Sequence, residues 1–488
     1  MKVAFIFPPY SHKLFAENLH VVDQQFGVFP PLNLLYAAAI LERAGHQVLV
    51  IDAASRRIDM AQALREVEEF DPALLAFNVI TYMYRQTLEW IVYMKKHTNL
   101  PVIIGGRNMT YYPYESMVDP HIDFGILGEA NSSLPIFMEA FAAGEGLEQV
   151  PGLAYKRNGE VVMNPPPPLV PFDDYPFPAR HLVPNENYFS HVSQLKNFTI
   201  GLTSLGCPHK CIFCVMAEMP YRVRSPRNVL DEIIHCYDTL GIREFDFFDS
   251  AMFENRTRIL ELCRLIGESG RRIEWSARSR VDSLDEELLA AMARSGCVRL
   301  FFGIESADRK ILKAIKKDID PQQITHTIEM TRSHGIRPLG FFMVGNPHED
   351  LSTVIKSVRL GHRLKLDYAQ FSRTIAKPKT LLDTQIIEST GYDYWSEYVL
   401  GNIGEKRLPS PWTDLTERQI EVYTKVAYIL FYFRPLYAAR ILLKARSFGE
   451  IVRYAKVAFM MLFHFNRDSK HEIVPGRQPR TAKANGNT

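Results

Sequence analysis

The sequence predicts an α/β protein made of a doubly wound, Rossmann-like domain, a partial (β/α)6 TIM barrel and a C-terminal helical region. Short apolar segments alternate with helix-like segments through residues 1–150, and the alternation returns in residues 196–400. Short apolar strands separated by helices are typical of parallel sheets covered on both faces, because a parallel connection has to cross the sheet. A group of three cysteines lies near the start of the second region.

Five strands and three principal helices are expected in residues 1–150. The strands are Val3–Phe7, Val48–Asp52, Ala73–Val79, Val102–Ile104 and Phe124–Leu127. The helices are Pro31–Ala44, Met60–Phe70 and Tyr84–His97. A doubly wound sheet binds its ligand beyond the carboxyl ends of its strands, so the residues there are the candidate binding residues.

Glycines, prolines and polar residues lie at or near these strand ends. Glycine lets the backbone approach a ligand closely, although a turn explains each glycine equally well when it is taken alone. The candidate ligand contacts at these strand ends are Pro9, Asp52, Asn78, Thr81, Gly105, Gly106, Gly128 and Glu129.

Residues 151–195 are expected to connect the two domains. Arg157–Glu160 contains the Asn-Gly turn signal of a β-hairpin, and the consecutive prolines Pro165–Pro168 follow it. Proline-rich segments are stiff and extended, which suits a spacer between domains.

The second region, residues 196–400, predicts six βα units. The strands are one at Thr199, then Glu244–Asp249, Ile273–Ala277, Val298–Ile304, Arg337–Val344 and Tyr368–Thr374. Examples of the helices between them are Pro226–Thr239, Asp285–Ser295 and Pro321–Ser333. Six units make an incomplete barrel, and catalytic groups of such barrels lie at the carboxyl ends of the strands.

Cys207, Cys211 and Cys214 share one loop after the first of these strands. Thiolates this close together usually hold a metal. A structural zinc site needs four ligands, so His209 would have to be the fourth, and a zinc-stabilised binding protein without turnover is the alternative to an enzyme. A four-iron cluster on three thiolates would leave one iron open to bind a substrate.

The spacing C-x3-C-x2-C, with Phe213 before the last cysteine, resembles the radical SAM superfamily. The resemblance implies a 4Fe–4S cluster on the three cysteines, whose open iron binds S-adenosylmethionine (SAM). It also implies that one electron cleaves SAM and releases a 5′-deoxyadenosyl radical, which abstracts a hydrogen atom from the substrate. A reducing electron donor of flavodoxin or ferredoxin type is implied with this chemistry.

Further segments resemble the same superfamily: Phe247–Ser250, Trp275–Arg278 and Phe302–Ser306. The implied SAM-binding residues are Phe213, Ser250, Arg278, Gly303 and Glu305. An ordinary salt bridge at a sheet end is the alternative for Arg278 and Glu305. Two later segments, Gly345–Glu349 and Ala376–Thr380, depart from the usual pattern on the substrate side of the barrel.

Residues 1–150 resemble the cobalamin-binding domain that often precedes a radical SAM domain. This resemblance is carried by the strand-end residues, by Pro30–Leu35 and by Gly45–Val48. It implies that cobalamin contacts the strand-end residues and also Leu32 and Asn33. The Asp-x-His-x-x-Gly motif, whose histidine coordinates cobalt in many cobalamin proteins, does not occur. The resemblance therefore implies cobalamin bound without a histidine ligand from the protein.

These implications predict a cobalamin-dependent radical SAM enzyme that functionalises an unactivated carbon of a small molecule, with C-methylation as the expected reaction. One SAM would make the radical, methylcobalamin would donate the methyl group, and a second SAM would recharge the cobalt. The alternative is an oxidative cyclisation or rearrangement without methyl transfer on a lipid-like or tetrapyrrole substrate. A methylthiotransferase would need a second cysteine triad, and no cysteine precedes Cys207.

The composition is that of an ordinary globular protein, and the net charge of +2 gives no bulk case for nucleic-acid binding. Residues 401–466 are expected to form a helical cap, and residues 467–488 a disordered tail. From Thr416 onward 13 Lys and Arg stand against 5 Asp and Glu, so these helices could instead contact a membrane surface or an anionic substrate. The first residues are too short an apolar run for a signal peptide, and a cytoplasmic location is expected.

Overall fold

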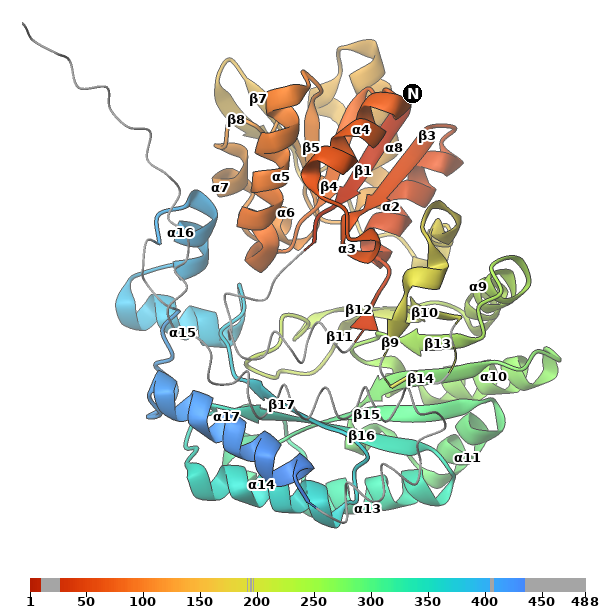
Figure 1. Ribbon diagram of the computed structural model, residues 1–488, viewed down its shortest axis with the longest axis vertical. Helices are drawn as coiled ribbons and strands as arrows, with labels where there is room; N and C mark the ends of the chain where they lie inside the picture. The colour runs from red at the N-terminus through yellow and green to blue at the C-terminus, as the bar shows by residue number, and fades with distance from the viewer. Residues whose placement is uncertain (10–26, 191, 194, 196, 404–407, 435–488) are drawn as a thin grey trace, which may run out of the picture.

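The structure is a computed structural model that describes residues 1–9, 27–190, 192–193, 195, 197–403 and 408–434 of the 488-residue chain. The N-terminal sheet with its helices lies at the top of Figure 1, and the barrel sheet lies below it. The helices and tail expected beyond residue 434 fall outside the described residues.

The N-terminal sheet has seven strands. In spatial order they are β3 (Gln47–Asp52), β1 (Lys2–Phe7), β4 (Leu74–Asn78), β5 (Val102–Gly105), β6 (Phe124–Ile126), β7 (Leu153–Arg157) and β8 (Glu160–Met163). The first five run parallel, which confirms the doubly wound prediction. The hairpin expected in the connector is instead the antiparallel edge of this sheet, with Leu153 opposite Ile126. It pairs the edge of β6, which would otherwise stay open.

Helices cover both faces of this sheet. On one face lie α2 (Leu32–Arg43) and α8 (Ala130–Ala143), and on the other α4 (Met60–Phe70) and α5 (Tyr84–His97). Successive side chains of a strand point to opposite faces. Phe5 of β1 therefore packs with α2 and α8, while Ile6 packs with α4 and α5.

The barrel sheet has six parallel strands in sequence order, which confirms the partial (β/α)6 barrel. They are β10 (Phe198–Gly201), β13 (Glu244–Phe247), β14 (Glu274–Ser279), β15 (Cys297–Glu305), β16 (Arg337–Val344) and β17 (Ala369–Arg373). The helices outside the sheet are α9 (Pro226–Thr239), α10 (Arg256–Glu268), α11 (Glu286–Arg294), α12 (Arg309–Ala314), α13 (Pro321–Ser333) and α14 (Leu351–Arg363).

A buried ion network joins the connector to the barrel. Arg180 of the connector is ion-paired at 2.7 Å with Glu232 of α9, and Arg224 is ion-paired with the same carboxylate. All three side chains are less than 5% exposed. Tyr36 of α2 is buried within range of the three charges, so both domains meet at this network.

The helices after the barrel divide between the two domains. The sequence places α16 (Tyr394–Leu400) in the barrel domain, whereas its buried Trp395 and Tyr398 pack into the core of the N-terminal domain. Helix α17 (Glu417–Tyr432) packs on α14 and β17, as expected of a cap. None of the helices in the described part of the chain has the length and apolarity needed to span a bilayer.

Candidate active site

The cysteine loop, residues 207–219, links two short antiparallel strands, β11 (Ser204–Cys207) and β12 (Met219–Val223), that follow β10. Gly206 has a φ of 79°, and a Cβ there would lie 2.0 Å from Pro220 O. Only glycine fits such a close approach with such a backbone. Cys207 thus ends a strand, while Cys211 and Cys214 follow in a turn closed by Cys214 N donating to Cys211 O at 3.1 Å.

Buried polar contacts hold the start of this loop on the barrel. The Asp249 carboxylate, just after β13, accepts from Thr203 Oγ1 at 2.7 Å and from Ser204 Oγ at 2.6 Å. The buried Arg258 of α10 donates to Thr203 O at 3.2 Å. Breaking one of these contacts would leave a buried polar group without a partner, so they fix the position of β11.

The thiols suit an iron–sulfur cluster as a donor set. Burial raises the pKa of Cys207 and of Cys211, so these thiols ionise readily only when a metal replaces the proton. Among the described residues no three His, Cys, Asp or Glu side chains converge on a single metal ion. Each thiolate of a cluster binds a different iron and does not need to converge in this way. His209, the fourth ligand of the zinc alternative, is hydrogen-bonded through Nε2 with Glu254 at 2.8 Å.

Two basic side chains beside the cysteines were not apparent from the motif. Arg280 and Lys317 both lie close enough to Cys211 to favour its thiolate electrostatically. Lys317 Nζ is ion-paired at 3.1 Å with Glu305 Oε1, and both side chains are under 10% exposed. A Cβ at Gly303 would lie 2.7 Å from Glu305 Oε1 and 2.8 Å from Lys317 Nζ, so glycine makes room for this pair.

Arg278 is the penultimate residue of β14, and its side chain lies on the sheet face opposite to that of the core residue Ala277. Arg278 is ion-paired with the buried Asp246, so the salt bridge named above as the alternative to SAM binding is present. Its guanidinium carbon lies 3.6 Å from the ring centroid of Phe248 and 4.8 Å from that of Phe301. Nη1 donates both hydrogen bonds of this side chain within the described structure, which leaves Nη2 and Nε for a ligand carboxylate.

Two further residues with an expected SAM contact lie near the mouth of the barrel. Phe213 is partly buried and packs against the barrel core. Ser250 is exposed just after β13. The fold thus brings together five of these side chains: Cys207, Cys211, Glu305, Arg280 and Lys317. Arg278 forms a second polar group with Asp246.

Two glycines at the carboxyl edge of the N-terminal sheet, which we call the cradle, have open space over them. Nothing lies within 4 Å of the position that a Cβ would take at Gly105 or at Gly128. Gly106 has a φ of 96°, and a Cβ there would lie 2.7 Å from Val79 O. Pro9 and Asn33 are exposed near the same edge, Asn78 is partly exposed, and Leu32 is buried. Open space over glycines fits the close backbone approach expected for cobalamin.

Two of the expected cobalamin contacts are bonded to protein groups, and a third is buried. The Asp52 carboxylate accepts from Tyr188 OH at 2.7 Å and caps a short helix through Ser55 N. Glu129 is ion-paired with Arg222 of β12, so it joins the two domains. Thr81 is 2% exposed.

Arg107 links the cradle to the cysteine loop. It begins the short helix α6 (Arg107–Tyr111) directly after the glycines at the end of β5. Its guanidinium lies 2.5 Å from Met216 Sδ and 3.2 Å from Met219 Sδ. The edge expected to bind cobalamin and the loop expected to bind the cluster therefore face each other.

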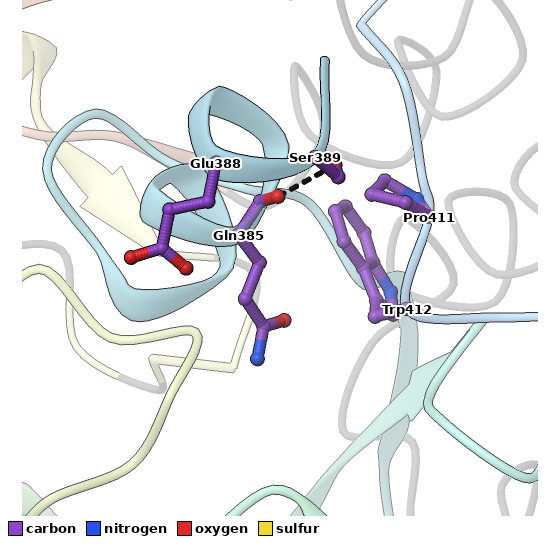
Figure 2. A pocket seen from close by; sticks show the side chains of 5 residues that line it. All are labelled: Gln385, Glu388, Ser389, Pro411 and Trp412. Atoms are coloured by element: carbon purple, nitrogen blue, oxygen red, sulfur yellow. Dashed lines mark hydrogen bonds between the residues drawn. The ribbon is translucent and has the colours of Figure 1, made fainter. Parts of the chain in front are cut away.

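A pocket of about 360 Å³ opens near the carboxyl end of β16. Trp412 forms one wall, and its indole N–H donates to Gly345 O at 2.9 Å. Gln385, Glu388 and Ser389 of α15 (Leu381–Thr390) form the other wall (Figure 2). Trp412 was not apparent from the sequence, but the unusual segment Gly345–Glu349 lies next to it.

Comparison with known proteins agrees with this geometry. Residues 202–361 match the family model of the radical SAM superfamily, and residues 20–137 match that of the B12 binding domain. An uncharacterized methyltransferase of Pyrococcus horikoshii is 30% identical over 83% of this chain and 88% of its own length. The anaerobic magnesium-protoporphyrin IX monomethyl ester cyclase of Cereibacter sphaeroides is 26% identical over 82% of this chain and 66% of its own.

A solved structure shares the fold. It is that of the radical SAM methyltransferase TsrM from Kitasatospora setae with cobalamin and a [4Fe-4S] cluster bound, with a TM-score of 0.64 and 20% identity over 80% of this chain and 75% of that one. The chain belongs to the radical SAM superfamily, among the members that carry a B12 binding domain. It is an enzyme whose cofactors are a 4Fe–4S cluster, SAM and cobalamin.

Proposed function

We propose that this enzyme transfers a methyl group to an unactivated carbon of a small molecule. The observation that carries the proposal is the contact of Arg107 with the cysteine loop, because it brings the cobalamin edge and the cluster edge to one space. When bound, the cluster supplies the electron that cleaves SAM, and cobalamin carries the methyl group. The protein's part is to bind, orient and shield these groups.

Cys207, Cys211 and Cys214 are proposed to hold the cluster, and Arg280 and Lys317 to offset part of its negative charge. Arg278 is proposed to bind the SAM carboxylate through the N–H groups that Asp246 leaves free. Ser250, Gly303, Glu305 and Phe213 complete the proposed SAM site.

Cobalamin is proposed to lie over Gly105, Gly106 and Gly128, with Pro9, Asn33 and Asn78 at its rim. Asp52, Thr81, Leu32 and Glu129 support this cradle from within. No histidine of the described N-terminal domain is needed as a cobalt ligand in this proposal.

The pocket beside Trp412 is proposed as the entrance for the substrate. It lies at the carboxyl end of the barrel strands, where substrates of such barrels bind. Its lining combines an indole face with the carboxylate of Glu388 and the amide of Gln385. The electron donor is proposed to be a flavodoxin- or ferredoxin-type protein.

A lipid-like substrate and contact with a membrane surface are proposed for helix α17. Helix α17 leaves Val422, Ile429 and Leu430 more than 40% exposed, which gives it an apolar outer face. Flotation of the enzyme with anionic liposomes would support membrane contact, and recovery of all protein in the unbound fraction would contradict it.

The products of SAM distinguish the proposed reaction from its alternative. Methyl transfer uses one SAM for the radical and a second as methyl source, so 5′-deoxyadenosine and S-adenosylhomocysteine form in equal amounts and the product gains one CH₂. Oxidative cyclisation, which the cyclase relative favours, forms 5′-deoxyadenosine without S-adenosylhomocysteine. Anaerobic turnover of the reconstituted enzyme, followed by mass spectrometry of both nucleosides, decides between them.

A further inference from the structure

A basic segment connects β15 to α13 and includes α12. Residues 309–317 contain five Lys and Arg and no Asp or Glu. Arg309 is ion-paired with Asp320, and Lys317 is the buried partner of Glu305. Lys310, Lys313 and Lys316 are exposed, and no carboxylate of the described residues lies within ion-pair distance of them. We call these three lysines the α12 patch.

The segment that carries the α12 patch contacts the cysteine loop. Ile212 N, between the second and third cysteines of the sequence motif, donates to Ile315 O at 3.2 Å. Both isoleucine side chains are buried, so no solvent layer separates the segment from the loop. Arg280 Nη2 also donates to Lys317 O at 2.8 Å, which fixes the end of the segment beside Cys211.

Other elements cover two further sides of the cysteine loop. Arg107 and the N-terminal domain contact it at Met216 and Met219. Helix α15 contacts it through Leu382 N, which donates to Ile212 O at 3.2 Å. Cobalamin and the substrate are assigned to those sides. The loop exposes Pro208, Lys210 and Glu218 at its own tip, so the approaches left to an external protein are this tip and the segment that carries α12.

We propose that the α12 patch is the docking surface for an acidic flavodoxin-type protein that reduces the cluster. This inference rests on the proposed flavodoxin-type donor. The patch has three exposed ammonium groups, and one exposed acid, Asp318, lies beside them. The resulting local positive field attracts an acidic partner. In the transfer itself, the flavodoxin hydroquinone is oxidised to the semiquinone and the cluster gains one electron.

The test compares two electron sources on the full-length reconstituted enzyme. SAM cleavage to 5′-deoxyadenosine is measured with dithionite, which needs no docking surface, and with photoreduced purified flavodoxin over a range of concentrations. The variant Lys310→Glu/Lys313→Glu/Lys316→Glu reverses the α12 patch. A matched control, Arg65→Glu/Lys96→Glu/Arg272→Glu, reverses three exposed charges elsewhere, on α4, on α5 and before β14.

The reversed patch is expected to raise the apparent KM for flavodoxin at least about tenfold, while the dithionite rate and the control variant stay at wild-type values. Added salt should raise the wild-type KM for flavodoxin, since it screens exposed charges. Equal KM values for the two triple variants, or a wild-type KM that does not respond to salt, would overturn the proposal. Methyl transfer is read separately from S-adenosylhomocysteine, so its failure would leave this test intact.

Discussion

Replacing Glu232 by glutamine tests how strongly the buried ion network stabilises the junction of the two domains. The change keeps the shape of the side chain but removes the only charge that compensates Arg180 and Arg224 in this network, and all three side chains are less than 5% exposed. Breaking a buried ion network by removing one partner costs about 3–5 kcal/mol, because a charge stays buried without compensation. For a domain of about 200 residues this lowers the midpoint of thermal unfolding by roughly 6–20 °C.

The matched control is Glu261→Gln on the outer surface of α10. Its partner Arg264 and the carboxylate itself are both exposed, so the same chemical change should leave the midpoint unchanged within error. Differential scanning fluorimetry of the apo proteins compares the two variants. A Glu232→Gln midpoint equal to that of the control would refute the argument that burial makes this network important.

The same variant has a pH signature. Arg224 and Arg180 outweigh burial and hold the pKa of Glu232 below its ordinary value. The stability contributed by this group is therefore fully present above the unfolded pKa of about 4.3 and is lost as the pH falls through the lower folded pKa. The difference between wild type and variant should stay constant from pH 8 to pH 6 and shrink in acid. A difference that grows in acid would contradict this sign.

Three other predictions concern the cofactors. Cys207→Ala should lose most of the roughly four irons per chain found after reconstitution, whereas Cys236→Ala, a buried thiol on α9, should keep them by iron analysis. Gly105→Leu should abolish cobalamin binding, because the leucine side chain would fill the open space over the cradle. The control Gly267→Leu adds the same side chain in open space on α10 and should bind cobalamin normally. Cobalt content after gel filtration measures the binding of both variants. Arg278→Lys should weaken SAM binding at least about tenfold in equilibrium dialysis, since an ammonium cannot form the fork, and unchanged binding would remove Arg278 from the SAM site.

Local patterns in the chain were enough to predict most elements of both sheets. Met60–Phe70 and Tyr84–His97 form helices with the predicted limits, and the barrel strands follow the predicted order. These elements depend on the period of apolar residues, which is a property of short segments. The hairpin β7–β8 was expected in the connector and α16 fell within the expected barrel range, whereas β7 pairs with β6 and α16 packs into the core of the N-terminal domain. An antiparallel edge and a docked helix depend on contacts distant in sequence.

The sequence by itself carried the resemblances that imply the cofactor chemistry, since three thiols at fixed spacing and glycines at strand ends are local features. Only the tertiary structure decided how these features meet. Lys317 and Arg280 reach Cys211, and Arg107 reaches Met216, across separations that no motif spans. The tertiary structure also showed that Glu129 is ion-paired with Arg222 and that Asp52 accepts a hydrogen bond from Tyr188. Packing determines which side chains are neighbours across the interface of two domains, and the apolar periodicity of either segment does not predict this packing.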